Sequence, residues 1–421
     1  MLLIVLLTAA AIATASAAFA VLLIEGFPQP GRAWLIRWLR RLGAFALFCW
    51  FLYWGWGAVH GNFLQGHQEA LGIDGRLYYR AAAAWLAGGN PWGPEAATYT
   101  NAWPSGCCVQ WLFTGPPPTV LAFAPLTLIP EDLFVRAWMA LTLAAAFYTL
   151  RRLGLPWWWI MFPPLAQGIT VGNPHVVCLA VLVAGSDHVR WLAVPLKAYA
   201  VAPLVGEQRW RALVGVGVAV GLSVVLFWPL WSSYLSQYGE INRWIGDATH
   251  GGFSAHRDPR LFAVTLAAVA ALAVLDWRAA GWLAVPALFP AGQFFYASFA
   301  LPLRSPWLAF ALATAGHRAD AAVPWIICGY AGLRVAGWGL ARGRRARRGP
   351  VAQHADVVGD GPGSPDHAVL DLPVVGAAGC DHAGVDGLVA RHGPVDRRDL
   401  RHATGGNGVV VTGDVVAGVG R

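Results

Sequence analysis

The chain has few charged residues: only 12% of its 421 residues are Asp, Glu, Lys or Arg, whereas 57% are hydrophobic. A soluble domain has about twice that charged fraction. Several apolar runs are long enough to cross a bilayer, which takes about 20 helical residues, and the 23 Trp residues suit the headgroup boundary. The composition therefore predicts an all-α fold, a polytopic transmembrane helical bundle that passes several times through the plasma membrane and is surrounded by membrane lipid.

Lysine is almost absent, because Lys197 is the only one and arginine supplies the rest of the positive charge. A formal net charge of +8 would suit a nucleic-acid partner. The arginines, however, mark the ends of apolar runs or lie in the C-terminal segment, so membrane topology explains them better. We therefore expect no nucleic-acid partner. Arginine in place of lysine is also typical of a GC-rich, bacterial genome.

Signatures of metal and nucleotide binding are missing from the sequence. None of the six cysteines has the spacing to histidine that a metal site needs. No dinucleotide fingerprint, phosphate loop or zinc motif is present either. We therefore expect neither a metal nor a cofactor.

Arginine clusters give the expected orientation of the spans, since positive residues favour the cytoplasmic side. The first apolar run, 2–24, has no positive charge before it and is interpreted as a span, with a cleaved signal peptide as the alternative. Arginines between residues 32 and 41 place the next connection in the cytoplasm, so the run 42–59 crosses outward. Residues 60–118 are then expected to form a large extracytoplasmic loop, which carries short juxtamembrane helices and the stretch considered below as a candidate catalytic site.

Later apolar runs differ in how continuous they are. Further spans are predicted at 133–150, 212–231, 261–275 and 321–341, with a polar loop at 232–260. Prolines and glycines interrupt the runs 157–185 and 281–315, which predicts short or kinked helices. Broken helices persist at membrane depth only beside protein or a wet cavity, so Gly172–His175 is expected to line a cavity.

The composition changes abruptly near the C-terminus, which divides the chain into a transmembrane domain, residues 1–342, and a tail, residues 343–421. From Gly349 onward there is no aromatic residue, no Ile and no Met. Such a segment buries too little apolar surface to offset its chain entropy, so we expect a disordered, basic and Gly-rich cytoplasmic tail. A second hypothesis is frameshifted translation, which an intact mass of the native protein matching the full sequence would exclude.

An acid, two arginines and two tyrosines lie close together in the stretch Gly72–Trp92, directly after an apolar span. The sequence predicts a short helix over 77–87, closed by Gly88 and Gly89 in a left-handed conformation. Asp74 precedes this helix and is a good N-cap residue. A carboxylate just beyond a span also suits a general base that takes a proton from a hydroxyl. The two roles are compatible, and Asp74 is the predicted catalytic residue.

Candidates for substrate binding from the same stretch are Arg76, Tyr78, Tyr79 and Arg80. Two of them, Arg76 and Arg80, lie four residues apart on one side of the helix. A guanidinium pair suits phosphate oxygens, and a solvated pair is an equal alternative. Leu77, Ala81 and Trp85 recur every fourth residue, so they share a face that is expected to lie on the membrane surface.

Three further candidates for substrate binding lie beyond residue 170. Lys197 interrupts the apolar run 191–206, and an ionisable group at such a place is a functional hypothesis by default. Its expected role is to pair with phosphate or pyrophosphate, whereas snorkelling to the interface is the alternative. Asn173 and His175 lie at the predicted helix break, where they can hydrogen-bond a sugar or phosphate or else satisfy the broken backbone.

These motifs form an ordered series. It runs from Asp74 and Tyr78-Tyr79-Arg80-Ala81-Ala82 to Gly88-Gly89-Asn90-Pro91-Trp92, Gly115-Pro116-Pro117-Pro118, Gly172-Asn173-Pro174-His175 and Lys197-Ala198-Tyr199. The series resembles glycosyltransferase family 87, integral membrane enzymes of GT-C type that are mostly mannosyltransferases using polyprenyl-phosphate sugar donors. The resemblance covers residues 73–211 well and residues 212–340 only in hydropathy.

The resemblance implies transfer of mannose, or another hexose or pentose, from a polyprenyl-phosphate donor, with inversion and without an obligatory metal. The acceptor would be a hydroxyl of a lipid-linked or cell-envelope glycan on the outer face of the membrane. Asp74 would deprotonate that hydroxyl, while Lys197, Arg76 and Arg80 would hold the leaving phosphate. A lipid-carrier flippase or transporter without transfer chemistry is the alternative, because broken helices and a buried lysine also suit transport. A third reading is an inactive subunit that binds the donor lipid.

Overall fold

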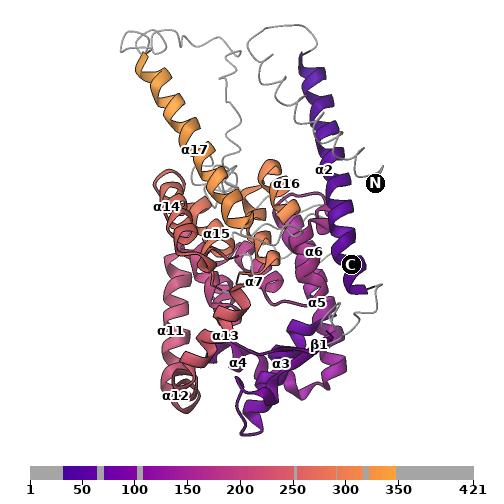
Figure 1. The fold of residues 1–421 in the computed structure, drawn as a ribbon, viewed down its shortest axis with the longest axis vertical. Coiled ribbons are helices and arrows are strands. Elements are labelled where there is room, and N and C mark those ends of the chain that lie inside the picture. Colours follow the sequence, from indigo (N-terminus) through magenta and orange to yellow (C-terminus); the bar gives the residue numbers. More distant parts are fainter. Residues whose placement is uncertain are drawn as a thin grey trace, which may run out of the picture. The chain divides into compact units, whose positions relative to one another are not determined.

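The computed structural model describes residues 32–63, 71–101, 108–250, 254–290, 292–315 and 322–347. The first predicted span, 2–24, and the tail from residue 348 onward lie outside these residues. Within them the chain is predominantly helical, which confirms the all-α class (Figure 1). Helix α17 extends to Arg347, so residues 343–347, assigned from the sequence to the tail, continue the last helix.

In chain order the helices are α2 (Arg32–Phe63), α3 (Ile73–Leu86), α4 (Pro117–Phe123), α5 (Glu131–Arg152), α6 (Pro163–Thr170), α7 (His175–Val183), α8 (Asp187–Arg190), α9 (Ala193–Leu196), α10 (Val201–Gly206), α11 (Trp210–Leu226), α12 (Trp228–Ser236), α13 (Tyr238–His250), α14 (Pro259–Leu275), α15 (Trp277–Leu288), α16 (Pro306–Thr314) and α17 (Ala322–Arg347). Short 3-10 helices are η2 (Pro94–Ala96), η3 (Ala124–Leu128), η4 (Trp157–Met161), η5 (Ala198–Ala200), η6 (Ala255–Arg257) and η7 (Phe294–Leu303). Strands β1 (Thr98–Asn101) and β2 (Cys108–Trp111) pair antiparallel, with Thr98 opposite Trp111.

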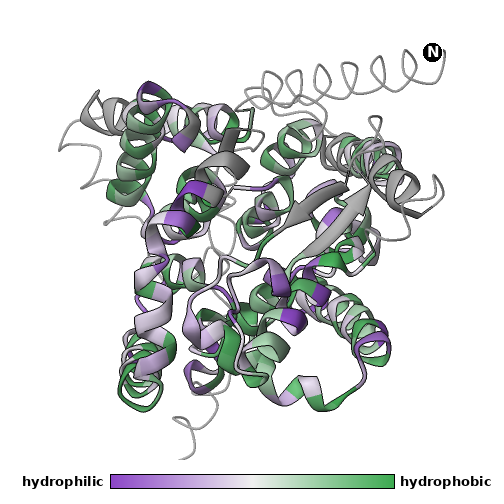
Figure 2. Ribbon diagram, turned by 60° about the horizontal axis from the view of Figure 1, so that its bottom comes forward, coloured by the Kyte–Doolittle hydropathy of each residue, from purple (hydrophilic) through white to green (hydrophobic). Residues whose placement is uncertain are grey.

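Among the described residues, α5 is the one helix long and apolar enough to cross a bilayer by itself. The pairs α6–α7 and α11–α12 also qualify when each pair counts as one span, although they bend by 120° and 91°. Figure 1 shows the second bend, with α12 turned across the end of α11. Hydrophobic residues dominate most helices (Figure 2). By length and composition the described residues therefore hold one span, which contains the predicted run 133–150, or up to three if each bent pair counts as one span, which would add the run 212–231. The predicted spans 42–59, 261–275 and 321–341 are not among these candidates.

The interrupted apolar runs form short, bent helices, as predicted. Gly172 adopts a left-handed conformation, with φ at 65°, in the break between α6 and α7. The run 281–315 likewise divides into the end of α15, then η7 and α16. The predicted polar loop at 232–260 is wrong in part, because α13 occupies Tyr238–His250. Ile241 of this helix is buried among apolar side chains, and the polar composition of the segment hid this apolar face.

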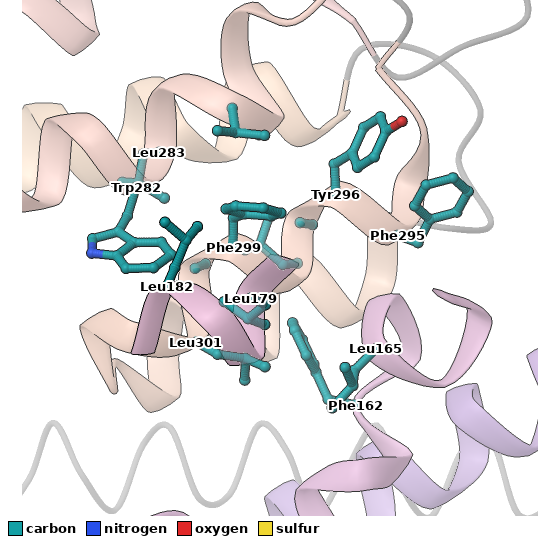
Figure 3. Packing of buried hydrophobic residues seen from close by; sticks show 14 of the residues in the cluster. Phe162, Leu165, Leu179, Leu182, Trp282, Leu283, Phe295, Tyr296, Phe299 and Leu301 are labelled. Atoms are coloured by element: carbon teal, nitrogen blue, oxygen red, sulfur yellow. The ribbon is translucent and has the colours of Figure 1, made fainter. Parts of the chain in front are cut away.

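Two large clusters of buried apolar side chains hold most of the helices together, and a third, small one lies at Ala255 and Leu261. The larger one joins α6, α7, α15 and η7 through side chains such as Phe162, Leu179, Trp282 and Phe299 (Figure 3). The smaller of the two large clusters surrounds α3 and includes Leu77 and Ala81 together with side chains of α4 and α5. The helix that carries the candidate acid is therefore an integral part of the packed structure.

Helices α10 and α15 contact each other backbone to backbone at two glycines. A Cβ atom on Gly281 would lie 2.7 Å from both the Ala202 carbonyl oxygen and the Gly206 Cα, and neither atom belongs to a flexible side chain. Gly281→Ala is therefore expected to push the helices apart and to lower the free energy of unfolding by about 1–3 kcal/mol. Thermal unfolding in detergent measures this, with Gly217→Ala as the control because nothing lies within 4 Å of that position. Equal loss in both variants would contradict the contact.

Candidate functional site

The N-terminus of α3 docks on the break between α6 and α7. Gly72 N–H donates to the Thr170 carbonyl at 3.0 Å, and Asp74 N–H donates to the Val171 carbonyl at 2.9 Å. Gly72 and Gly172 both have φ near 65°, and a Cβ on Gly172 would lie 3.0 Å from the Gly72 Cα. Two glycines thus permit a close approach that side chains would prevent, and the approach fixes the backbone of Asp74.

Asp74 faces an amide across this contact. Asn173 Nδ2 donates to Asp74 Oδ2 at 2.6 Å, joining residues 99 positions apart in sequence. The predicted N-cap role is wrong, because α3 begins at Ile73, and its N-cap, Gly72, has no side-chain cap. Asp74 therefore lies within the first turn, and its carboxylate is committed to a tertiary contact. The predicted left-handed end of the helix is confirmed for Gly88, which has φ at 80°, but not for Gly89.

His175 lies behind Asn173 and has no exposed surface. Its backbone N–H donates to Asn173 Oδ1 at 2.9 Å, and its ring Nδ1 lies 3.2 Å from the same oxygen. Because a carbonyl oxygen only accepts, this geometry requires the proton on Nδ1. The ring stacks on Phe295 at 5.0 Å between centroids. His175 thus holds the Asn173 oxygen away from Asp74 and turns the amide NH2 toward the acid.

The backbone of Lys197 is extended, with φ at −152°, in the connection between α9 and η5. Its ammonium is 4.9 Å from the Tyr78 ring centroid and 5.8 Å from the centroids of Tyr199 and Tyr296. It also donates to the Tyr296 hydroxyl at 3.4 Å. Three tyrosine rings at these distances stabilise a cation through their quadrupoles, and Figure 3 shows Tyr296 beside the buried core.

The acid and the ammonium belong to one electrostatic cluster. Burial raises the pKa of Asp74, while the positive charge of Lys197 and the hydrogen bond from Asn173 act in the opposite direction. Burial likewise raises the pKa of Tyr78, so its hydroxyl stays protonated at neutral pH. Asp74 and Lys197 both retain some accessible surface. The structure thus brings together five of the predicted site residues: Asp74, Tyr78, Asn173, His175 and Lys197.

The other three candidates lie on a different side of α3. Arg76 and Arg80 lie two and six residues after Asp74, which at 100° per residue turns both away from the acid. Their Nε atoms are 3.3 and 3.0 Å from the same oxygen of Glu131, at the start of α5. The Tyr79 hydroxyl donates to the Ile129 carbonyl at 2.8 Å. In this structure the two arginines attach α3 to α5, and Tyr79 attaches it to the turn that precedes α5.

The expectation that the stripe of Leu77, Ala81 and Trp85 lies on a membrane surface is wrong. Leu77 and Ala81 are buried, and Trp85 packs with its ring 6.0 Å from that of Phe227. The spacing identified the apolar face correctly but not what covers it.

Four residues contact the site although the sequence did not predict them as site residues: Glu131, Trp138, Tyr199 and Tyr296. Trp138 Nε1 donates to the Gly172 carbonyl at 2.7 Å and so holds the break in place. Tyr199 was noticed only as part of a motif. Tyr296 and Glu131 lie in ordinary apolar or helix-start contexts, and only the folded chain brings them near α3.

Across the part of the chain that the structure describes, no group of three or more His, Cys, Asp or Glu side chains is arranged to hold a metal ion. Comparison with known protein families, with curated proteins and with solved structures finds no match for this chain. The site is therefore interpreted from its own chemistry.

Proposed function

We propose that this chain is a membrane-embedded glycosyltransferase of GT-C type that uses a polyprenyl-phosphate sugar. The observation that carries the proposal is that Lys197, the only lysine of the chain, lies over the Tyr78 ring of α3 and near enough to Asp74 for its charge to act on the pKa of that carboxyl, and both side chains keep accessible surface. A lone acid beside a lone ammonium suits a reaction in which a hydroxyl loses a proton while a phosphate leaves. The sugar would be mannose or another hexose or pentose, and the acceptor a hydroxyl of a lipid-linked or envelope glycan.

The proposed mechanism is a single in-line displacement at the anomeric carbon. Asp74 accepts the proton of the acceptor hydroxyl as its oxygen attacks, and the bond from the sugar to the phosphate oxygen breaks with inversion. The two electrons of that bond remain on the leaving polyprenyl phosphate, whose added negative charge Lys197 stabilises. Asn173 holds the carboxylate in position through its 2.6 Å hydrogen bond. No metal is needed for this proton and charge balance.

The three side chains that contact α5 or the turn before it take a different part in the proposal. Arg76 and Arg80 already share Glu131, so neither is free to act as a phosphate clamp without breaking an ion pair. We therefore assign Arg76, Tyr79 and Arg80 to holding α3 in place. Phosphate contact is left to Lys197, with Tyr78 and Tyr296 beside it.

A transfer assay tests the proposal. Purified full-length protein in nanodiscs is incubated with radiolabelled polyprenyl-phosphate mannose, and with the corresponding hexose and pentose donors, plus extracted envelope glycolipids. A new glycoside that depends on the protein supports the proposal. No product with any donor, combined with movement of the intact donor across a vesicle bilayer, would support the flippase instead. The bent pairs α6–α7 and α11–α12 favour that alternative.

A further inference from the structure

The two ends of helix α5 lie beside different groups of charged side chains. Its first residue, Glu131, binds Arg76 and Arg80 of α3, whereas its last turn ends in Arg151 and Arg152. At 1.5 Å per residue these ends are about 30 Å apart, which matches the hydrocarbon thickness of a bilayer. The side chains that anchor α3 and the arginine end of α5 are therefore separated by about one membrane thickness.

An ionic cluster with surplus positive charge lies at the arginine end of α5. We call it the Glu207 cluster; its members are Arg152, Asp187, Arg190, Glu207, Arg209 and Arg278. Glu207 forms ion pairs with Arg190, Arg209 and Arg278, whose guanidinium nitrogens lie 3.3–3.4 Å from its carboxylate oxygens. The Trp282 indole N–H also donates to Glu207 at 3.0 Å. The Arg152 side chain passes close to Gly185, since a Cβ atom on Gly185 would lie 3.1 Å from Arg152 Nη2.

Two carboxylates cannot neutralise the four guanidinium groups of the Glu207 cluster. Both oxygens of Glu207 already accept two donors each, so the acid has no capacity left for the remaining N–H groups. The Arg209 and Arg278 side chains are 39% and 38% exposed. Arg278 Nη2 also donates to the Pro302 carbonyl at 3.2 Å, a neutral partner that leaves its charge uncompensated. A charge of about two units is left for an external anion.

Exposed indole rings border this surplus charge. Trp210 follows Arg209 directly and is 65% exposed, whereas Trp277 precedes Arg278 and is 56% exposed. Trp157, which follows α5 by five residues, is 70% exposed. Indole rings favour the headgroup level of a bilayer, which would set the neighbouring guanidinium groups at the depth of lipid phosphates.

We propose that the Glu207 cluster binds the headgroup phosphate of anionic phospholipid, in the leaflet opposite to α3. Guanidinium pairs match phosphate oxygens in geometry and charge, and adjacent tryptophans distinguish a lipid from a soluble anion. An excess of arginine favours the cytoplasmic leaflet, where anionic lipids attract basic side chains. The inference rests on the bilayer setting of the proposed function but not on sugar transfer.

Lipid retention tests this site without any sugar donor. Full-length protein in neutral detergent is titrated with phosphatidylglycerol or phosphatidylcholine, and bound lipids are counted by native mass spectrometry. The expected result is preferential retention of phosphatidylglycerol. The double variant Arg209→Gln/Arg278→Gln should weaken it about 25-fold, which is about fivefold for each arginine. Arg209→Lys/Arg278→Lys keeps the charge and should lose less.

The control is Arg243→Gln, because Arg243 is an exposed arginine of α13 that pairs only with Glu240 at 3.2 Å among the described residues. It should retain phosphatidylglycerol as the unaltered protein does. Equal binding of the two lipids, or equal loss in the Arg243 variant, would overturn the proposal. Displacement of the lipid by millimolar inorganic phosphate would also overturn it, since the site would then be one for a free anion. Each of these results is independent of whether transfer activity is detected.

Discussion

Asp74→Asn should reduce sugar transfer by about 10²–10⁴-fold, the usual contribution of a general base. Asparagine has nearly the same shape, and its amide oxygen can still accept the hydrogen bond that Asn173 donates. The variant therefore keeps the contact between α3 and the α6–α7 break but has no group that takes up a proton. The initial rate of glycoside formation, measured on protein with an unchanged melting temperature, checks this prediction.

The pH dependence of transfer gives an independent signature of the same carboxylate. Burial raises the pKa of Asp74 above its ordinary value of 3.8, so the base becomes active only as the pH rises through that higher pKa. Asn173→Ala removes a hydrogen bond that opposes the shift, and the acid limb of kcat/KM should move to still higher pH. The opposite movement, or none, would mean that another group controls the limb.

Ionisation of Asp74 is expected to support activity but to lower the stability of the fold. A raised carboxyl pKa means that the folded chain holds the proton more tightly than the unfolded chain. The contribution to stability is then complete below the unfolded pKa and is lost as pH rises through the folded pKa. Ionised Asp74 therefore destabilises the fold near neutrality, and Asp74→Asn should be at least as stable there as the unaltered protein. Asp132→Asn, which alters an exposed acid in the first turn of α5, is the control expected to change neither property.

Sequence patterns predicted the elements that depend on nearby residues. Gly88 terminates α3 because a glycine can adopt φ at 80° without strain, and this requirement is visible in the sequence. The break at Gly172 was equally predictable, since glycine and proline interrupt a helix whatever surrounds it. The start of α3 was not, because its first turn is fixed by hydrogen bonds to Thr170 and Val171, about 100 residues away.

The residues of the candidate site also differ in how far the sequence alone could predict their roles. The chemistry of Asp74 and Lys197 made them candidates wherever the chain placed them, and the structure joins them in one cluster. Arg76 and Arg80 looked equally suited to phosphate, yet both turn to Glu131. Their partner lies 51 residues or more away and carries no local signal. Helical spacing showed that the two arginines share a side, but not which acid of the chain would occupy it.

Lys197→Met should lower transfer by about 10²–10³-fold, which is the usual loss when a group that stabilises transition-state charge is removed. Methionine keeps much of the side-chain volume but has no charge to offset the leaving phosphate. The loss should appear mainly in kcat, because the phosphate gains negative charge only as its bond to the sugar breaks. Steady-state kinetics with a saturating series of polyprenyl-phosphate sugar concentrations separates kcat from KM.

Two further substitutions distinguish the effect of the Lys197 charge from the effect of the tyrosine side chains around it. Tyr296→Phe keeps the ring 5.8 Å from the ammonium but removes the hydroxyl that accepts its hydrogen bond. This change should lower the rate by at most about 10- to 160-fold, since one hydrogen bond to a charged group contributes about 1.5–3 kcal/mol. Lys197→Arg keeps the charge but places a planar group among three rings arranged around a compact ammonium, so it should recover activity only in part. Full activity of Lys197→Met would exclude the proposed role.

A double-mutant cycle connects this prediction with the first one. When Lys197 is replaced, Asp74 loses the cation that favours its ionised form, and its pKa rises further. The acid limb of any residual activity in Lys197→Met should therefore move to higher pH. In Asp74→Asn that limb should be absent, whatever residue is at position 197. If the two substitutions change the transfer barrier additively and leave the limb in place, the acid and the ammonium act at separate places. A non-additive cycle, with coupling of at least about 0.5 kcal/mol, is what one shared site requires.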